Sequence, residues 1–539
     1  PAMHSLRLLL PALSALWLLQ VVGCGDDSSS GGSSTGGSPA GGNSGSSTGG
    51  GSTGGSGGGG GGSAPVTWTA CTLGELAAEC TTLAQPLQRD GASDATVDFH
   101  VKRVLASQPP SQGQLWLLQG GPGLAGSTLA GLVPLVQTIA PNLDIYLPDH
   151  RGVGESSPLL CDGFDTPISG AASPPSEAAV AAVGSACVDQ LLATWGSIEG
   201  FSSVEAAADL GETIERTRDG DEPVFLWAVS YGTRWALRYL QQYPEQASGV
   251  VLDSLESESL SFTDFGAQLE TAAQPLLALC SADPFCSGRL GADPTAFVDA
   301  LMAKLAAGHC PTTANLTQGD HRLLFTKTMT LPTALRNALP ALLFRVDRCN
   351  AQDQAAILSL RALFAASEAE LGPSASGVLN VHVALSELYD ENPASFDSLL
   401  ASDASRAFSN GDAGFYRGLY DSWPRYYASP YRGQYPTTDV PVLMLQGTLD
   451  PLTPPQHAEE VAAALSAPGQ TLVLLEGGAH GSLFQSQTTS GSDCGAELMT
   501  AFLGAPSAAL DTSCASDLVQ PSFDDDGLSF LFGTSLLWD

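Results

Sequence analysis

The stretch that most constrains the fold of this chain is VFLWAVSYGTRWALRYLQQYP, which covers Val224–Pro244. Its first six residues are all apolar, which is typical of a strand that is buried on both faces. Beyond Ser230 the pattern becomes helical, because Trp235, Tyr239 and Tyr243 recur at every fourth position before a proline ends the run. The stretch therefore predicts a buried strand that turns directly into an amphipathic helix, with a serine at the corner.

Other short apolar runs in the chain also end in loops of Gly, Asp, His or Ser. These runs begin at Gln114, Leu143, Gly249, Pro441 and Gln470. Helical patterns lie between several of them, as in the segment that follows Ser203. This alternation predicts an α/β fold with a mostly parallel sheet covered by helices on both faces. In such a fold the ligand site lies at the carboxyl ends of the strands.

Ser230 stands in a pattern that presents a nucleophile on a tight turn between strand and helix. The turn needs small residues on both sides of the serine, as in Gly-x-Ser-x-Gly. Here Ala228 replaces the first glycine and Gly232 is the second. The pattern predicts that Ser230 is a catalytic nucleophile, and the alternative is a buried serine turn without chemistry.

A serine hydroxyl needs a base to remove its proton and an acid to orient that base, in the chain order Ser, acid, His. His480 lies in the glycine-rich loop GGAHGS after the last predicted strand, whereas His457 has the position of a helix start. Asp450 ends the run before that loop and is the expected acid. Asp253, at the end of the preceding strand, is its rival.

The oxyanion that forms during acyl transfer requires two backbone N–H groups. Tyr231, the residue after the nucleophile, is expected to supply one of them. The loop QGGPG supplies the other, because its glycines let the backbone approach a substrate closely. Pro122 has no N–H to donate. Gly121 is therefore the expected donor, with Gly120 as the alternative.

Residues 255–440 separate two predicted strands and are far more than one crossover needs. They are rich in Leu and Ala at helical spacing, so we expect a helical cap inserted over the site; the alternative is core helices without a gating role. A cap over the nucleophile restricts the length of the substrate, which suits an enzyme that removes residues from a free amino terminus, and such an enzyme needs carboxylates for the ammonium group. Glu387, Glu256 and Glu258 are the candidates.

The amino-terminal residues 1–24 resemble a lipoprotein signal peptide that starts at Met3 and ends in the lipobox VVGC. Cys24 is then the lipidated residue, and the alternative is an ordinary signal peptide with a chance cysteine. Residues 25–63 are almost entirely Gly, Ser and Thr, which predicts a flexible linker. By resemblance to known lipoproteins, Gly25 after the cysteine favours the outer membrane.

Ten further cysteines indicate an oxidising, extracytoplasmic compartment. They are Cys71, Cys80, Cys161, Cys187, Cys280, Cys286, Cys310, Cys349, Cys494 and Cys514. Pairing of sequence neighbours is the simplest expectation, although sequence alone does not determine connectivity. None forms a CxxC pair and no histidine has zinc-finger spacing, so no metal and no cofactor is predicted.

The formal net charge is −35, from 21 basic and 56 acidic residues. Such a surface repels phosphate backbones, so nucleic acid is excluded as the expected partner, and the charge serves solubility. The expected partner is a peptide or a small acyl substrate. Contact with a membrane is expected only through the lipid anchor, and the sequence does not indicate an oligomeric state.

The motifs GGPG, PDHRGVGES, AVSYGTRWALRY, GVVLDS, GTLDPLTP and GGAHGS together resemble the alpha/beta-hydrolase family of proline iminopeptidases and secreted tripeptidyl-aminopeptidase-like hydrolases. The resemblance runs from about Cys80 to Phe523 and includes a carboxyl-terminal segment with paired cysteines. It departs from the family at Ala228, at Gln119 where iminopeptidases usually carry His, and at Leu385 where relatives often have Cys.

The resemblance implies that Ser230 is the nucleophile, Asp450 the orienting acid and His480 the base. It also implies an alpha/beta-hydrolase core made of residues 64–254 and 441–539, the latter with the TAP-like segment. The expected activity is release of one to three residues from the free amino terminus of peptides. A carboxylesterase that uses the same triad is the alternative, and a non-catalytic binding protein is a third possibility.

Overall fold

The computed structural model describes four stretches of the chain, residues 66–164, 176–371, 374–426 and 430–539. The predicted signal peptide, the lipobox residue Cys24 and the linker at 25–63 lie outside these stretches. The described part begins at Val66, three residues ahead of the first strand.

One sheet of nine strands forms the centre of the described part of the chain. The strands are β1 (Thr69–Leu73), β2 (Leu76–Pro86), β3 (Thr96–Val104), β4 (Gln114–Leu118), β5 (Asp144–Pro148), β6 (Val224–Val229), β7 (Gly249–Asp253), β8 (Val442–Gly447) and β9 (Gln470–Leu475). Their order is β1-β2-β3-β5-β4-β6-β7-β8-β9. The pairs from β1 to β5 are antiparallel, and all pairs from β5 to β9 are parallel.

The central strands β4, β6, β7 and β8 are buried along their whole length. Their residues are apolar on both faces because helices cover both faces of a parallel sheet. The register pairs Val229 with Asp253, and Asp253 with Leu445. The carboxyl ends of β6 and β7 therefore lie side by side. Ser230 and Ser254, the next residues of the chain, stand at this edge of the sheet.

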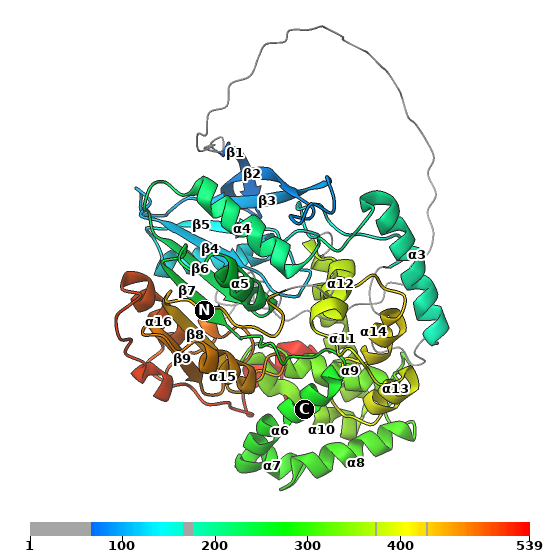
Figure 1. The fold of residues 1–539 in the computed structure, drawn as a ribbon. Coiled ribbons are helices and arrows are strands. Elements are labelled where there is room, and N and C mark those ends of the chain that lie inside the picture. Colours follow the sequence, from blue (N-terminus) through cyan, green and yellow to red (C-terminus); the bar gives the residue numbers. More distant parts are fainter. Residues whose placement is uncertain (1–65, 165–175, 372–373, 427–429) are drawn as a thin grey trace, which may run out of the picture.

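Helices cover both faces of the sheet (Figure 1). On one face lie α4 (Ser203–Thr217), α5 (Tyr231–Gln242) and α15 (Pro455–Ala464), and on the other lie η1 (Gly126–Leu132), α2 (Val133–Ile139) and α16 (Cys494–Gly504). Successive side chains of β4 point to opposite faces of the sheet. Trp116 and Leu118 belong to the apolar cluster on one face, and Leu115 and Leu117 belong to the cluster on the other. This architecture confirms the predicted α/β class.

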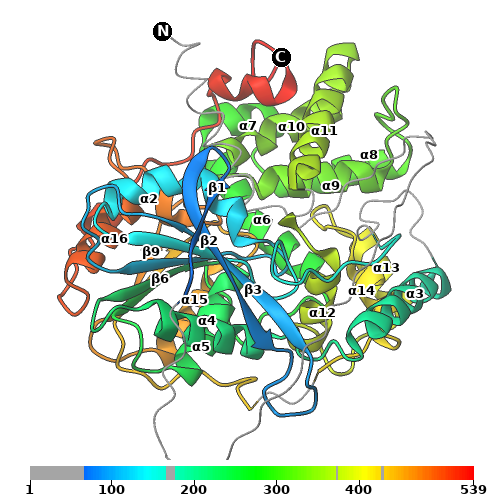
Figure 2. The ribbon, with the colours of Figure 1, turned by 90° about the horizontal axis from the view of Figure 1, so that it is seen from above.

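The chain between β7 and β8 forms a helical layer on one side of the molecule (Figures 1 and 2). Its members are α6 (Phe265–Ala282), α7 (Pro284–Leu290), α8 (Pro294–Ala306), α9 (Gln318–Met329), η2 (Leu335–Ala338), α10 (Leu339–Arg348), α11 (Ala351–Leu371), α12 (Gly377–Glu387), α13 (Phe396–Ala404) and α14 (Ala413–Tyr420). The predicted helical insertion at 255–440 corresponds to this layer.

Two segments from outside the insertion also join the helical layer. The helix α3 (Glu177–Trp195) packs closely on α14, since a Cβ at Gly184 would lie 2.3 Å from the side chain of Leu419. By length and composition alone α3 could cross a membrane, but here it has a buried face. The carboxyl-terminal η6 (Asp526–Phe532) packs on α11, and Trp538 is buried in the same apolar cluster. Apolar residues distant in sequence thus complete one core.

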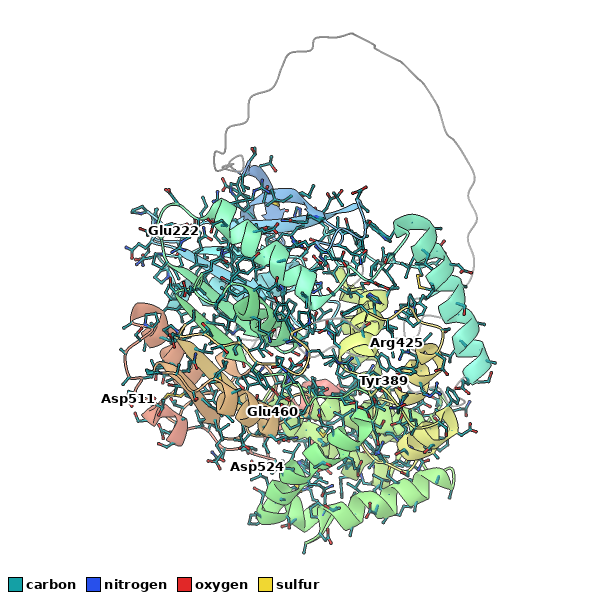
Figure 3. The ribbon with its side chains drawn as sticks, viewed as in Figure 1. Glu222, Tyr389, Arg425, Glu460, Asp511 and Asp524 are labelled. Carbon is teal, nitrogen blue, oxygen red and sulfur yellow. A yellow bond between two sulfur atoms is a disulfide. The ribbon has the colours of Figure 1, made fainter. Side chains whose placement is uncertain are left out.

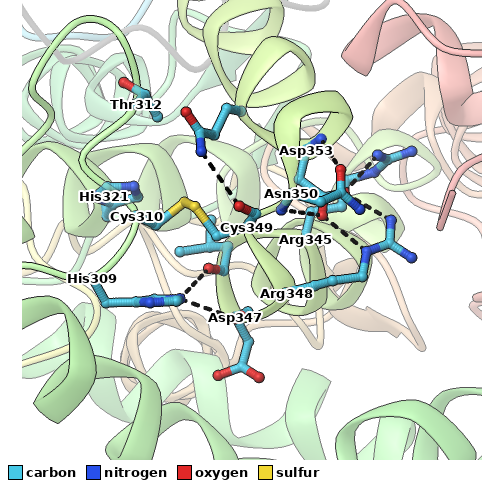
Figure 4. Close-up of a disulfide and its surroundings, with 12 residues drawn as sticks. His309, Cys310, Thr312, His321, Arg345, Asp347, Arg348, Cys349, Asn350 and Asp353 are labelled. Atoms are coloured by element: carbon cyan, nitrogen blue, oxygen red, sulfur yellow. Dashed lines mark hydrogen bonds and ion pairs between the residues drawn. A yellow bond between two sulfur atoms is a disulfide. The ribbon is translucent and has the colours of Figure 1, made fainter.

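Five disulfides cross-link the described chain. They join Cys71 to Cys80, Cys161 to Cys187, Cys280 to Cys286, Cys310 to Cys349, and Cys494 to Cys514. This pairing of sequence neighbours confirms the expectation from the order of the cysteines in the chain. The Cys310–Cys349 bond ties the segment before α9 to the end of α10 (Figure 4). Disulfides form and persist in oxidising compartments, so they indicate an extracytoplasmic protein.

Many of the acidic side chains lie at the surface. Asp511 and Asp524, both labelled in Figure 3, are exposed. Carboxylates in water keep their hydration, so the excess of negative charge carries little desolvation cost where it lies outside. The buried carboxylates are fewer, and several of them gather near Ser230, as described next.

Candidate active site

Ser230 forms the corner between β6 and α5 in the strained conformation that the sequence pattern predicts. Its backbone angles are φ 58° and ψ −131°, a region that residues with a side chain rarely adopt. The Ser230 amide donates to the Asp253 carbonyl at 3.0 Å. A Cβ at Gly232 would lie 2.3 Å from the Leu118 carbonyl oxygen, so only glycine fits there. Ala228 is fully buried in the strand, where its methyl group packs in the core.

Asp450 and His480 lie in contact at the ends of β8 and β9. The imidazole Nδ1 of His480 is 2.8 Å from Asp450 Oδ2. Thr453 donates its hydroxyl to the same carboxylate oxygen at 2.8 Å, and the amides of Leu452 and Thr453 donate to Oδ1 at 2.9 and 3.0 Å. Three donors from one loop therefore hold the carboxylate toward the imidazole.

The charge of each partner shifts the pKa of the other. Burial disfavours protonated His480, but Asp450, with smaller contributions from Asp253 and Glu256, holds the pKa of the imidazole above its ordinary value. Burial likewise disfavours ionised Asp450, but His480 and the Thr453 hydrogen bonds hold the pKa of the carboxyl below its ordinary value. The pair is thus an ionised acid beside a basic imidazole.

Asp253, the rival acid, holds the loop that follows His480. Its two carboxylate oxygens accept the amides of Ser482 and Leu483 at 2.7 and 3.0 Å. Complete burial raises the pKa of Asp253 to about 6, although those amides lower it. Asp450 therefore faces the imidazole Nδ1, and Asp253 anchors the first turn of η4 (Ser482–Phe484).

The QGGPG loop passes directly over Ser230. A Cβ at Gly120 would lie 2.7 Å from the Cβ of Ser230 and 3.2 Å from its hydroxyl oxygen. The Gly120 amide already donates to the side-chain oxygen of Gln119 at 2.7 Å. Gly121 has φ +118°, and within the described chain neither its amide nor that of Tyr231 donates to an acceptor. The geometry thus favours Gly121 and Tyr231 over Gly120.

The helical insertion contacts this loop directly. Gly123 accepts the Ser376 amide, and Ala125 donates its amide to Ser374, each at 2.8 Å. The side-chain amide of Asn380, on α12, donates to the Pro122 carbonyl at 3.0 Å. The insertion therefore lies against the loop that holds the candidate oxyanion donor, which is the position expected of a cap.

The three candidate amine-binding glutamates come together with two arginines of α5. We call Glu256, Glu258, Glu387, Arg234 and Arg238 the glutamate–arginine cluster. Arg234 contacts Glu256 at 3.2 Å and Glu258 at 3.4 Å, and Arg238 contacts Glu258 at 2.8 Å. The side chains of Arg234, Arg238 and Glu256 are buried, that of Glu258 is 8% exposed, and Glu387 is half-buried. Within the described residues the cluster has three carboxylates and two guanidinium groups, which leaves one negative charge in excess.

Within the described chain the groups at contact distance from the Glu387 carboxylate are neutral donors, whereas arginines form ion pairs with Glu256 and Glu258. The Glu387 carboxylate accepts the Ser203 hydroxyl at 2.7 Å, the Ser203 amide at 3.1 Å and the Tyr426 hydroxyl at 2.5 Å. Burial disfavours its ionised form, but Arg238, Arg234 and these hydrogen bonds hold the pKa of Glu387 below its ordinary value. Burial raises the pKa of Glu256 despite Arg234. Glu387 is thus a half-buried carboxylate that stays charged near neutral pH.

Sequence reasoning missed Arg234 and Arg238. They stand four and eight residues after Ser230, and this helical spacing of two charges on a helix between apolar runs was the available signal. A second serine–histidine contact also escaped notice: Ser257 Oγ lies 2.8 Å from His457 Nδ1. Both residues are buried. Within the described residues, no group of three or more His, Cys, Asp or Glu side chains is arranged to hold a metal ion.

Comparison with known proteins identifies two regions of the chain. Residues 115–278 match the family model for the alpha/beta hydrolase fold, and residues 413–514 match the model for TAP-like protein. Ser230 lies in the first region, and Asp450 and His480 lie in the second. The two matches agree with the resemblance found in the sequence. A comparison with curated proteins finds no match.

Solved structures that match this chain share little sequence with it. An esterase from Exiguobacterium antarcticum is 14% identical with a TM-score of 0.30, and the match covers 72% of this chain and 90% of that one. A laboratory-evolved potato epoxide hydrolase is 13% identical with a TM-score of 0.31, covering 74% and 93%. An esterase from Thermogutta terrifontis is 14% identical with a TM-score of 0.28, covering 74% and 91%.

Proposed function

Because this chain is an alpha/beta hydrolase with a TAP-like carboxyl-terminal region, we propose that it is a Ser-His-Asp aminopeptidase that releases residues from the free amino terminus of peptides. The observation that carries the proposal is the glutamate–arginine cluster, whose two arginines lie on α5, the helix that begins at the nucleophile. Its excess negative charge suits the ammonium group of a peptide, and an ester substrate has no need of it.

In the proposed mechanism Ser230 Oγ attacks the scissile carbonyl carbon while His480 accepts the hydroxyl proton. Asp450 keeps the imidazole in the tautomer that accepts this proton, and it stabilises the imidazolium that forms. The carbonyl oxygen becomes an oxyanion, which the Gly121 and Tyr231 amides stabilise. The imidazolium then donates its proton to the leaving amine, and an acyl-enzyme remains on Ser230.

Water completes the reaction. His480 accepts a proton from the water molecule as its oxygen attacks the acyl carbon, and the second tetrahedral intermediate collapses with return of that proton to Ser230. The released acid is the amino-terminal residue, dipeptide or tripeptide of the substrate. The helical insertion limits how much peptide can extend past the nucleophile on its amino side.

A substrate panel tests this proposal. We expect the enzyme to cleave alanyl-prolyl-alanyl or prolyl anilides with a free amine, and to cleave the N-acetylated forms of the same anilides at least about a hundredfold less efficiently, because acetylation removes the charge that the cluster binds. The N-acetylated anilide is the matched control, since its scissile bond is unchanged.

Other outcomes of the panel would replace the proposal. Equal cleavage of free and acetylated anilides, or turnover of short-chain nitrophenyl esters alone, would instead indicate a carboxylesterase. Failure of a fluorophosphonate to label the protein would indicate a non-catalytic binding protein.

We also propose that Cys24 anchors the enzyme to the bacterial envelope, with the outer membrane favoured. The lipobox pattern and the Gly- and Ser-rich linker support this location. The five disulfides of the described chain are compatible with it.

A further inference from the structure

Arg336 of η2 reaches from the helical insertion into the space between the two loops that carry Asp450 and His480. Its Nη1 donates to the Leu449 carbonyl at 3.0 Å and to the Gly478 carbonyl at 3.4 Å, and its Nη2 donates to the Gly477 carbonyl. Leu449 directly precedes Asp450, and Gly478 lies two residues before His480. One guanidinium group therefore contacts both loops.

A second contact of the same segment holds the histidine loop. The Thr333 hydroxyl accepts the Ala479 amide at 3.0 Å, and the Thr333 amide donates to the Gln485 side-chain oxygen at 2.7 Å. Gln485 in turn donates to the His480 carbonyl at 2.8 Å. Thr333 and Arg336 thus bind the backbone just before His480 directly, and Thr333 reaches the His480 carbonyl through Gln485.

Arg336 also places a positive charge beside the acid. The side chain is 1% exposed, and burial lowers the pKa of the guanidinium to about 10, although the Asp450 charge raises it. It therefore stays protonated at neutral pH. Within the described chain it forms no ion pair at contact distance, and its hydrogen-bond partners are all backbone carbonyls.

We propose that Arg336 is a positioning residue that ties the Asp450 loop to the His480 loop and so holds the acid and the base in register. This inference rests on the proposed function, because it concerns the acid and base of that mechanism. It assigns to the insertion a part in assembling the catalytic machinery in addition to covering it. An enzyme that lacks the contact keeps Ser230 in place but loses the alignment of its base.

The test measures the rate at which a fluorophosphonate labels Ser230, which does not depend on knowing the substrate. In this reaction a bond forms between the serine oxygen and phosphorus, fluoride leaves, and His480 takes the serine proton. We expect Arg336→Gln to slow labelling by about tenfold or more, because small displacements of a base from its productive geometry have effects of this size.

The pH dependence of labelling separates positioning from general stability. Besides Arg336, the charged or titratable groups that face the Asp450–His480 pair are Asp253, Glu256 and His457. At low pH the labelling rate falls because His480 becomes protonated, and we call this fall the acidic limb. Removal of the Arg336 charge stabilises the imidazolium, so Arg336→Gln moves the acidic limb to higher pH. Thr333→Val removes one hydrogen bond and no charge, so it slows labelling without moving the limb.

Arg345 provides a matched control. It is a fully buried arginine of α10 that pairs with Asp353 (Figure 4) and donates to the carbonyls of Leu536, Leu537 and Asp539, and none of these contacts involves the triad. Arg345→Gln removes the same group and lowers stability, but we expect its labelling rate and its acidic limb to match those of the unmodified enzyme.

The outcomes separate this inference from the proposed function. If the unmodified enzyme shows no labelling that depends on Ser230, the proposed function fails. If it labels and folded Arg336→Gln labels at the same rate with the same acidic limb, the inference alone fails. If Arg336→Gln does not fold, Arg336→Lys is the variant to test. Its ammonium group keeps the charge but cannot donate hydrogen bonds to both loops with the geometry of the guanidinium. An unchanged rate in that variant would equally overturn the inference.

Discussion

At the scale of single residues, Ser230 differs from every other serine of the described chain in its combination of surroundings. It has a strained backbone, a loop of glycines above it and the first turn of a helix behind it. Strain at one residue persists only where the surrounding structure fixes it, and active sites are the usual place. The observed conformation therefore supports the proposed role more than the sequence pattern alone.

We predict that Ser230→Ala reduces anilide turnover by about a millionfold while the thermal unfolding midpoint stays near that of the unmodified enzyme. Alanine adopts the same backbone angles at a similar cost and removes only the hydroxyl. Ser257→Ala is the matched control, because Ser257 also contacts a histidine, His457, and should keep full activity. Retention of more than a few percent activity by Ser230→Ala would reject the nucleophile assignment.

A second prediction separates the two buried acids. Asp450→Asn should lower kcat by about four orders of magnitude with little change in unfolding temperature, because the amide favours the wrong tautomer of His480. Asp253→Asn should affect stability more than chemistry, since the Ser482 and Leu483 amides use different carboxylate oxygens and the NH2 group that replaces one of them cannot accept a hydrogen bond. An inactive Asp253→Asn beside an active Asp450→Asn would reverse the assignment.

The pH profile provides a third prediction. The neutral imidazole is the base, so activity falls as the pH drops below the pKa of His480. Because Asp450 holds that pKa above the ordinary value for histidine, kcat/KM should rise with an apparent pKa above about 6.5. Asp450→Asn removes the charge that stabilises the imidazolium, so the pKa of His480 falls. The apparent pKa at which the residual activity of this variant appears should therefore be lower. A rate that does not change between about pH 5 and 9 would exclude His480 as the base.

At the scale of elements, α5 combines three functions of the proposed site. Its amino end carries the nucleophile and the Tyr231 amide, and its next two turns carry Arg234 and Arg238. The arginines hold Glu256 and Glu258 in place by ion pairs, while Glu387 of α12 keeps only neutral partners at contact distance within the described chain. One helix thus sets the position of the nucleophile relative to the cluster that recognises the amine.

The fourth prediction follows from this arrangement. Glu387→Gln should raise KM for a free-amine anilide by about ten- to a hundredfold, because it removes the excess negative charge of the cluster. The fluorophosphonate labelling rate should change little, since the probe has no amine. Glu391→Gln, which alters an exposed carboxylate four residues later, is the control. An equal rise of KM for the N-acetylated anilide would show that Glu387 shapes the pocket without binding the amine.

At the scale of the whole molecule, the helical layer is assembled from three parts of the chain. The insertion supplies most of it, α3 packs on α14, and the carboxyl-terminal residues pack on α11. The layer also reaches the catalytic loops, since Asn380 contacts Pro122 and Arg336 contacts Leu449. The helical layer and the sheet are therefore in direct contact at the loops that hold the candidate site residues.

The fifth prediction concerns the location of the whole protein. If Cys24 is lipidated, the protein expressed in its bacterial host should partition into the detergent phase, and Cys24→Ala should move it into the soluble fraction. Activity per molecule should not change, because the linker separates the anchor from the folded domain. Mass spectrometry of the mature amino terminus provides the check, and an unmodified terminus at another residue would reject the lipobox.

The sequence by itself determined the features that depend on local pattern. Apolar runs of strand length predict the parallel sheet, and the small residues around Ser230 predict the tight turn. Cysteines close in sequence predict disulfides between neighbours. The resemblance to a known family points to Asp450 and His480 through short motifs. Each of these inferences needs only residues that are close together in the chain, so the physical constraint is visible in the sequence.

Only the tertiary structure decided which atoms meet across long stretches of chain. Asp253 ends β7 and Asp450 lies in the loop after the adjacent strand β8, and only the folded loops show that Asp450 faces His480. The Gly120 amide is already used by Gln119, which no pattern reveals. The contact of Arg336 with the carbonyl of Leu449 joins residues more than a hundred positions apart. Such contacts depend on how the helical layer packs against the sheet, and hydrophobic periodicity carries no information about that packing.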